Sequence, residues 1–257
     1  MQVSLSGRRR PDQDLEPTTG GSAAPAAERA RHGRRVRARW VWAGLLACCL
    51  VVGLGGPWWL RTRAAAQFPV AAADLADARA ALTALPVRAP ASSDGYERAQ
   101  FGAAWGDEDH NGCDTRNDVL ARDLTAPVVE ECVVLRGTLD DPYTGTRIAF
   151  ARGSGSAAVQ IDHVVALADA WQTGAASWSA ARRRSFANDP ANLLAVDGGA
   201  NQDKGASDAS AWLPPSVGYR CVYVLRQVRV KAAYGLWVTP DERSALAREL
   251  GRCVIGR

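Results

Sequence analysis

Several features are scarce or missing in the 257-residue sequence, and each absence excludes a class of protein. There are three His, and none of the four Cys after residue 60 belongs to a Cys-x-x-Cys pair, which disfavours a zinc site. No internal repeat is present, which excludes repeat architectures. From residue 68 onward, 20 basic side chains stand against 23 acidic ones, which argues against nucleic-acid binding driven by phosphate neutralisation alone. These 190 residues suffice for one domain with a sizeable core.

Charge is also absent from residues 40–60, a run of 21 mostly apolar residues that is long enough to cross a hydrocarbon layer of about 30 Å. Trp residues stand at both ends of this run, and six Arg lie between Arg29 and Arg39. This pattern predicts a single-pass membrane anchor with the N-terminus in the cytoplasm and the rest outside the cell. The alternative is a signal peptide cleaved near Ala64, which predicts a secreted protein.

Composition divides the chain into four parts. Residues 1–39 are rich in Arg, Pro, Gly, Ala and Ser, which predicts a disordered basic cytoplasmic tail. Residues 40–60 are the transmembrane anchor or signal segment, 61–95 a linker with a short helix, and 96–257 the folded domain.

The four cysteines after residue 60 are expected to form two disulfides, because the predicted location outside the cell is oxidising. Three pairings are possible. We expect Cys113 to pair with Cys132 and Cys221 with Cys253, because each pair brackets one compact stretch of predicted structure. Such loops contribute about 3 to 4 kcal/mol each in the chain-entropy description.

Apolar periodicity and turn residues predict an α+β domain. Val133 to Thr138 and Thr146 to Ala151 flank a turn around Pro142 and Gly145, which predicts a β-hairpin. Gly198 and Gly199 are expected to form a turn. Helices are expected over 71–85, 179–188, 201–212, 221–234 and from Thr239, where Pro240 and Glu242 complete a helix-start signal, and further strands over 159–165 and 192–196.

Three short motifs follow one another between residues 160 and 205. Asp162-His163 lies on a predicted strand, Asn192 opens the next strand, and Asn201-x-x-Lys204-Gly205 opens a predicted helix. Their order and spacing resemble the signature of the HNH nucleases, the ββα-metal class. The longer stretch 96–253 is similar to small exported bacterial HNH proteins related to the C-terminal nuclease domain of the GmrSD type.

The resemblance implies a role for each matching residue. His163 corresponds to the general base, Asp162 and Asn201 to the metal ligands, Asn192 to the Asn that braces the loop and orients the His, and Lys204 to a basic residue near the phosphate. Many members have His at position 201 and Pro at position 166, whereas this chain has Asn and Ala. Because oxygen ligands suit Mg²⁺ or Mn²⁺ better than zinc, we expect one of these two ions.

The same residues suit phosphodiester hydrolysis without the resemblance, because that reaction needs a base, a cation and a rigid frame. Adjacent residues on a regular strand point to opposite faces, so Asp162 and His163 converge only if the strand ends there. We therefore expect residues 164–167 to leave the strand. Taken alone, His163 continues an apolar strand face and resembles a core histidine. Arg116 is a further candidate for phosphate binding, with a salt bridge to Asp118 or Asp123 as the alternative.

The predicted fold is a ββα-metal core with an added β-hairpin and flanking helices, held by two disulfides behind an N-terminal membrane segment. The predicted function is a metal-dependent endonuclease that cleaves DNA or RNA with little sequence preference, because no separate base-reading module is present. The alternative is a non-catalytic, disulfide-stapled binding module of the cell envelope that retains the fold. Nucleic acid and, through residues 40–60, the membrane are the expected partners, and no feature indicates a protein partner.

Overall fold

The computed structural model describes residues 39–56, 63 and 67–255, which belong to two units, 1–56 and 57–257. In the first unit, residues 39–56 are helical, and the stretch Val51–Gly55 is a π-helix. No helix in the described parts of the chain is long and apolar enough to cross a membrane. The expected membrane segment at 40–60 therefore has no support in the described residues, and its last four positions, like most of the expected tail at 1–39, lie outside them.

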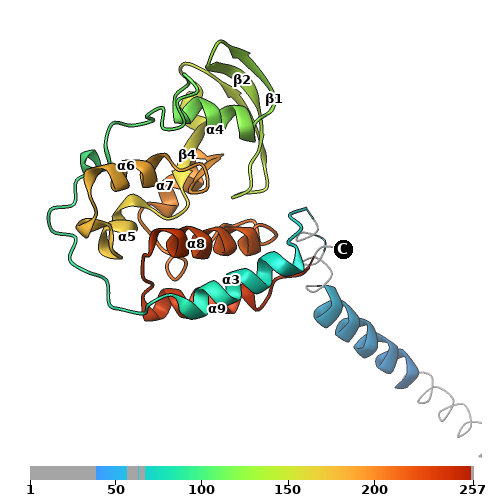
Figure 1. Cartoon of the computed structure of the whole chain (residues 1–257). Coiled ribbons are helices and arrows are strands. Elements are labelled where there is room, and N and C mark those ends of the chain that lie inside the picture. Colours follow the sequence, from blue (N-terminus) through green and yellow to red (C-terminus); the bar gives the residue numbers. More distant parts are fainter. Residues whose placement is uncertain (1–38, 57–62, 64–66, 256–257) are drawn as a thin grey trace, which may run out of the picture. The chain divides into compact units, whose positions relative to one another are not determined.

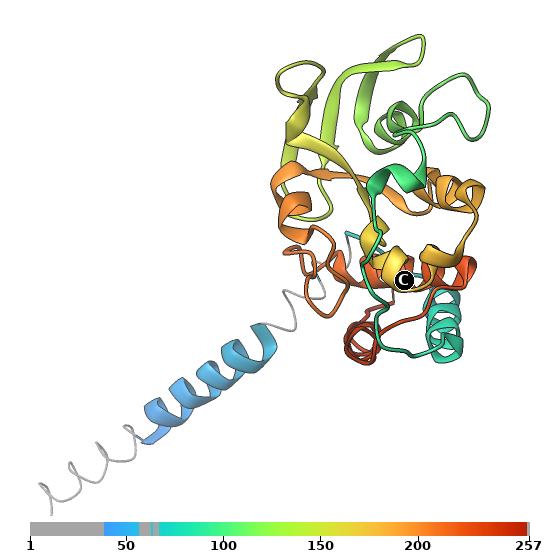
Figure 2. The same cartoon turned by 90° about the vertical axis from the view of Figure 1, so that its left-hand side faces the viewer.

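The second unit contains both sheets and most helices (Figures 1 and 2). The strands are β1 (Thr125–Glu130), β2 (Val133–Asp140), β3 (Arg147–Ala151), β4 (Val159–His163) and β5 (Leu193–Asp197). The helices are α3 (Ala72–Ala84), α4 (Thr115–Asp123), α5 (Leu167–Gln172), α6 (Ala180–Asn188), α7 (Gly198–Lys204), α8 (Arg220–Tyr234) and α9 (Pro240–Leu250), with short 3₁₀ turns at Arg98–Phe101, Ser156–Ala158 and Ala175–Ser177. The mixture confirms the expected α+β class.

The three-stranded sheet has the order β1-β2-β3, and both pairs are antiparallel. The hairpin expected around Pro142 and Gly145 is β2–β3, with Thr138 opposite Ala149. Its loop is shaped by Asp141, whose carboxylate accepts hydrogen bonds from the backbone N–H groups of Tyr143 and Thr144. The β1 strand and the helix α4 beside it were missed by the sequence analysis, because both are short and their apolar positions are few.

The second sheet consists of β4 and β5, which pair antiparallel with Asp162 opposite Leu194 and His163 opposite Leu193. This pair and α7 lie between the three-stranded sheet and the layer of α3, α8 and α9 in both views (Figures 1 and 2). Strand β4 ends at His163 and α5 begins at Leu167, so the prediction that residues 164–167 leave the strand is confirmed.

The helix layer is built on apolar stripes of three helices. Leu75, Ala78 and Leu82 of α3 are buried in one cluster with residues of α8 and α9. The helix expected within the linker 61–95 thus contributes directly to the core. Helix α9 begins as expected, with a capping box between Thr239 and Glu242.

Both expected disulfides are present, which confirms the pairing. Cys113 is bonded to Cys132, and Cys221 is bonded to Cys253. The first joins the start of α4 to the turn between β1 and β2, and the second joins the first turn of α8 to the chain after α9.

One element differs clearly from its prediction. The helix expected over 201–212 runs from Gly198 to Lys204, so the predicted turn at Gly198 and Gly199 is its first turn. The Asp197 side chain starts this helix by accepting a hydrogen bond from the Ala200 N–H at 2.8 Å. Gly205, with a φ of +51°, ends it. A residue with a side chain is strained at such a φ, so the helix cannot continue to residue 212 without changing this position.

Candidate active site around His163

The strand β4 and the helix α7 bring three of the predicted site residues to one cavity of about 360 Å³. Asp162 and His163 line it from the end of β4, and Asn201 lines it from α7. Gln160, which sequence analysis did not single out, lies between them and accepts a hydrogen bond from the Asn201 amide nitrogen at 2.8 Å. Because the strand ends at His163, the two adjacent side chains reach the same cavity.

A glycine permits the close approach of α7 to β4. A Cβ atom at Gly198 would lie 2.3 Å from the Ala157 carbonyl oxygen and 3.1 Å from the Gln160 amide nitrogen. Any larger residue would therefore push the start of α7 away from the strand. Since Asn201 lies one turn further along the helix, this contact sets its position beside Gln160.

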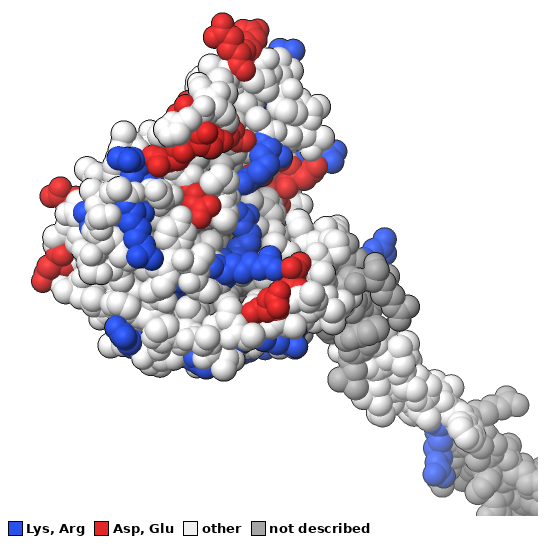
Figure 3. Space-filling model, viewed as in Figure 1, with Lys and Arg blue, Asp and Glu red and all other residues white. Residues whose placement is uncertain are grey.

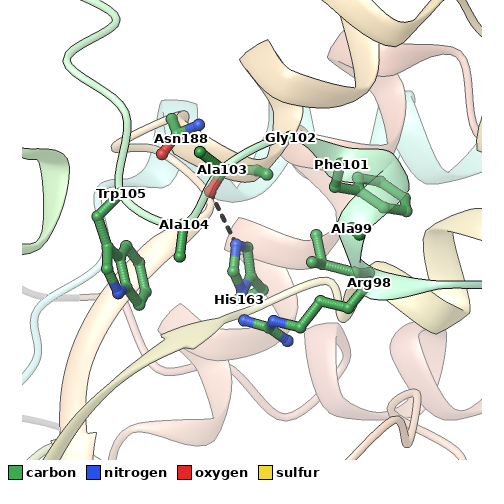
Figure 4. Close-up of a pocket in the computed structure, with 11 residues that line it drawn as sticks. Arg98, Ala99, Phe101, Gly102, Ala103, Ala104, Trp105, His163 and Asn188 are labelled. Carbon is green, nitrogen blue, oxygen red and sulfur yellow. Dashed lines mark hydrogen bonds between the residues drawn. The ribbon is translucent and has the colours of Figure 1, made fainter.

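The orientation of His163 is fixed by one backbone hydrogen bond. Its Nε2 lies 2.8 Å from the carbonyl oxygen of Ala187, the bond drawn in Figure 4. A carbonyl oxygen can only accept, so Nε2 carries the proton and Nδ1 keeps its lone pair. Burial lowers the pKa of His163 to about 4, against the opposing effect of the Ala187 carbonyl. The side chain is therefore neutral near pH 7 with an unprotonated Nδ1, and its lowered pKa makes it a weaker base than an exposed histidine.

Asn192 holds the segment that follows His163. Its side-chain oxygen accepts from the Val165 N–H at 2.8 Å, its side-chain nitrogen donates to the Val165 carbonyl at 3.2 Å, and its backbone carbonyl accepts from the Val164 N–H at 2.8 Å. The residue is fully buried. Asn192 thus ties the backbone of residues 164 and 165 to the start of β5, and its expected role in orienting His163 stays a prediction.

The carboxylate of Asp162 is held by two donors. The Tyr143 hydroxyl donates to Oδ2 at 2.5 Å, and the Lys204 ammonium donates to Oδ1 at 2.8 Å. All three side chains are buried. Burial raises the pKa of the Asp162 carboxyl, and Lys204 and Tyr143 act in the opposite direction by stabilising its charged form.

Lys204 is enclosed, with 1 % of its surface exposed, and its ammonium also donates to the His163 carbonyl oxygen at 2.9 Å. An enclosed ammonium has no path to a substrate phosphate. The structure thus places Lys204 as a support for Asp162 and for the end of β4, in contrast to the phosphate contact expected from the sequence.

Arg116 lines neither of the two cavities around His163. Its guanidinium is half-buried and lies 3.4 Å from the Val159 carbonyl oxygen, at the other end of β4. Within residues 67–255, no salt bridge joins it to Asp118 or Asp123, and Asp123 pairs with Arg122 instead. Neither interpretation of Arg116 is supported by a contact, and its role toward phosphate stays a prediction.

Comparison with known proteins places this geometry in a family. The family described as GmrSD restriction endonucleases, C-terminal domain, matches residues 114–249, more than half of the chain. The chain belongs to this GmrSD C-terminal domain family. A protein of Arthroderma benhamiae, described as an uncharacterized secreted protein, is 40% identical over 179 residues, which cover 68% of this chain and 84% of the relative. No solved structure matches the chain significantly.

Membership of the GmrSD family confirms the resemblance found in the sequence and indicates a nuclease-like domain. The match begins at the N-cap of α4 and ends in α9, so it includes both sheets and every residue assigned from the HNH motifs. It does not include residues 67–113, which contribute α3 and part of the wall around His163.

Divalent metals are implied by the HNH-type family, and the donor chemistry of the cavity fits them. Asp162, Asn201 and Gln160 line it and carry side-chain oxygen atoms, the ligands that hard cations prefer. The Asp162 oxygens already accept hydrogen bonds from Tyr143 and Lys204. In the described part of the chain, no group of three or more His, Cys, Asp or Glu is placed to hold a metal.

Two residues near the motifs were missed by the sequence analysis. Tyr143 was taken only as part of a turn. An aromatic residue in an otherwise polar turn could have signalled a distant contact, and the structure shows it buried against Asp162. Arg98 lines both cavities, and within residues 67–255 no carboxylate forms a salt bridge with it. Figure 4 shows its guanidinium beside the His163 ring. Nothing in the sequence around Arg98 pointed to this position.

Proposed function

We propose that this member of the GmrSD family is a metal-dependent endonuclease that hydrolyses phosphodiester bonds of DNA or RNA. One observation carries the proposal: a neutral His163, fixed through Nε2, lines the same cavity as the oxygen donors of Asp162 and Asn201. A general base beside a site for a hard cation can deprotonate a water molecule and stabilise the phosphate that it attacks, which phosphodiester hydrolysis requires.

The residues of the chain divide the work as follows. Nδ1 of His163 accepts the proton of the attacking water, while the Ala187 carbonyl keeps the ring in place. Asp162 and Asn201 would hold the metal ion, which supplies stabilisation for the charge developing on the phosphate and the leaving oxygen. Arg98, exposed at the cavity, binds a phosphate oxygen. Tyr143 and Lys204 act as positioning residues for Asp162.

We also propose that the domain is exported. Its relative in Arthroderma benhamiae is described as secreted. The two disulfides are typical of proteins that fold in an oxidising compartment.

A non-catalytic binding module stays the second candidate because of a specific observation. The Lys204 ammonium already neutralises Asp162, which weakens the attraction of the cavity for a cation. Figure 3 shows a short band of basic side chains near the middle of one face, with acidic side chains beside it. Because both lysines are buried, this band consists of arginines. Such a band suits an anionic partner without requiring hydrolysis.

The deciding experiment incubates the full chain with plasmid DNA and with RNA in the presence of Mg²⁺, Mn²⁺ or a chelator. We expect cleavage that chelation abolishes. His163→Ala removes the base and should lower the rate roughly 100- to 10,000-fold with metal affinity nearly unchanged. Asp162→Asn should lower activity and metal affinity together. The activity of the parent should persist down to about pH 5, since the pKa of His163 is lowered to about 4.

Matched controls separate chemistry from folding. His110→Ala removes the other histidine of the folded unit, which is exposed, and Asp140→Asn removes an exposed carboxylate paired with Arg147. Both should keep the parental rate. A His163→Ala protein that cleaves at the parental rate with the same metal requirement would falsify the assignment, and intact binding without cleavage by the parent would favour the binding module.

A further inference from the structure

A second cavity, of about 240 Å³, also has His163 in its wall (Figure 4). The two cavities share His163, Arg98 and Leu167 as walls. The second one differs in chemistry, because Phe101, Trp105 and several alanines line most of it. It is smaller than the roughly 300 to 1,000 Å³ of sites for drug-sized ligands, so it suits a single planar ring system.

Trp105 provides a flat surface in this cavity. Its ring is nearly parallel to that of His163, with 12° between the planes and 6.1 Å between the centroids. Its backbone has a φ of +60°, which is uncommon for a bulky residue and marks a conformation that the surroundings impose. Within the described residues, no hydrogen bond engages its indole N–H. The indole is thus held in place but has no polar partner of its own.

Asn188 adds an independent observation. It lines the same cavity with 3 % of its surface exposed, and its side-chain nitrogen donates to the Arg184 carbonyl at 3.0 Å. Its side-chain oxygen is buried and has no hydrogen-bond partner. An unpaired buried acceptor is unfavourable unless a water molecule or a ligand supplies a donor. The wall of this apolar cavity therefore contains one hydrogen-bond acceptor, the side-chain oxygen of Asn188, to which no protein group donates.

We propose that this cavity is a subsite for an unpaired nucleobase next to the phosphate that is cleaved. The base lies against Trp105 and donates an N–H from its Watson–Crick edge to the side-chain oxygen of Asn188, while Arg98 holds the phosphate between the two cavities. In a duplex that N–H is used by the partner base. The subsite therefore selects single-stranded or locally unpaired nucleic acid, a substrate class that rests on the proposed nuclease function.

Oligonucleotide binding measured in the presence of a chelator, which prevents metal-dependent cleavage, tests the subsite. The full chain should bind a labelled single-stranded oligonucleotide more tightly than the same sequence as a duplex, and more tightly than an oligonucleotide whose central positions are abasic. Stacking on an aromatic side chain contributes roughly 5- to 150-fold in affinity per base. Trp105→Leu should therefore weaken single-strand binding about tenfold and leave the weak binding of the abasic strand unchanged.

Trp237 provides the matched control, because it lines neither cavity and contacts Arg88 and the Ala89 carbonyl instead. Trp237→Leu should bind the single strand as the parent does. Asn188→Leu, similar in size but without an acceptor, should weaken binding of the single strand and spare the abasic one.

The outcomes separate this inference from the nuclease proposal. Equal binding of the intact and abasic strands by the parent, or an unchanged affinity of Trp105→Leu, overturns the subsite even if the protein cleaves nucleic acid. Base-dependent binding lost in Trp105→Leu supports the subsite even if no cleavage occurs. Because the abasic comparison uses the unmodified protein, it decides the question even if a variant does not fold.

Discussion

The chain has two lysines among its 31 basic residues, and both are buried, but in different surroundings. Lys231 of α8 pairs with Asp169 at 3.0 Å and with Glu242 at 2.6 Å, and none of the three lines either cavity around His163. Lys204 pairs with Asp162 at 2.8 Å, and that carboxylate lines the larger cavity. We call the first cluster sealed because it borders neither cavity, and the second open because it borders a space that a ligand can enter.

The difference shows how one kind of buried ion pair serves two purposes. An ammonium is a compact charge with three donors, so it can join groups from separate elements in little space. Lys231 joins α5 to the capping box of α9 and thereby supports the helix layer. Lys204 joins the side chain of Asp162 to the backbone carbonyl of His163, and thereby fixes the two residues of the Asp-His motif.

The largest effect is expected from breaking the sealed cluster. Lys231→Met leaves two carboxylates facing each other without a counter-charge, and breaking a buried pair in this way costs about 3 to 5 kcal/mol. Urea unfolding followed by circular dichroism measures the loss. Arg229→Met is the control, because this exposed residue of the same helix pairs with Asp74 at the surface and should cost under about 1 kcal/mol. Equal losses in the two variants would contradict the comparison.

A smaller effect is expected at the open cluster. Lys204→Met leaves Asp162 with the Tyr143 hydroxyl and with access to water in the cavity. In the presence of a chelator, the free energy of unfolding should therefore fall by about 2 kcal/mol. Adding Mg²⁺ should restore part of it, since the ion can take over the charge of Lys204. Thermal unfolding with and without Mg²⁺ checks this. A Lys204→Met protein that Mg²⁺ stabilises no more than it stabilises the parent or Lys231→Met would remove the distinction between the clusters.

The third effect, comparable in size to the second, concerns pH. Burial raises the pKa of Glu242 to about 7, helped by Asp169 and opposed by Lys231. Between the unfolded value of about 4.5 and this folded value, the native state keeps a proton that the unfolded state has released. Stability contributed by the protonated form is therefore present below about pH 4.5 and is lost as pH rises through 7.

Glu242→Gln should flatten this dependence and gain roughly 2 to 3 kcal/mol over the parent at pH 8 relative to pH 5. Free energies of unfolding at these two pH values measure it. Asp241→Asn, at the neighbouring exposed carboxylate, should leave the slope unchanged. If the free energy of unfolding of Glu242→Gln changed with pH as steeply as that of the parent, another group would be responsible for the pH dependence.

Local patterns predicted much of this molecule. Thr239 and Glu242 form the expected capping box, and the two disulfides pair as expected. The strand also ends at His163, as predicted from the requirement that two adjacent side chains converge. Each of these inferences uses residues close together in the chain or one geometric rule.

Contacts between distant segments could not be inferred in the same way. Tyr143 reaches Asp162 from the loop of the other sheet, and Arg98 and Trp105 reach His163 from a segment about 60 residues earlier. Lys204 was expected beside the substrate phosphate because the family resemblance implies a basic residue there. Its burial follows from the tertiary packing of α7 against β4, which no periodicity in the sequence encodes.

The burial of both lysines has a consequence for the chemistry of the folded protein. With side chains fully enclosed, neither ε-amine offers a target to acetylating or cross-linking reagents while the domain stays closed. Modification at Lys204 without modification at Lys231 would report opening of the cavity alone, whereas modification at both would report unfolding of the helix layer. Chemical modification of the two amines therefore distinguishes local opening of the cavity from unfolding of the helix layer.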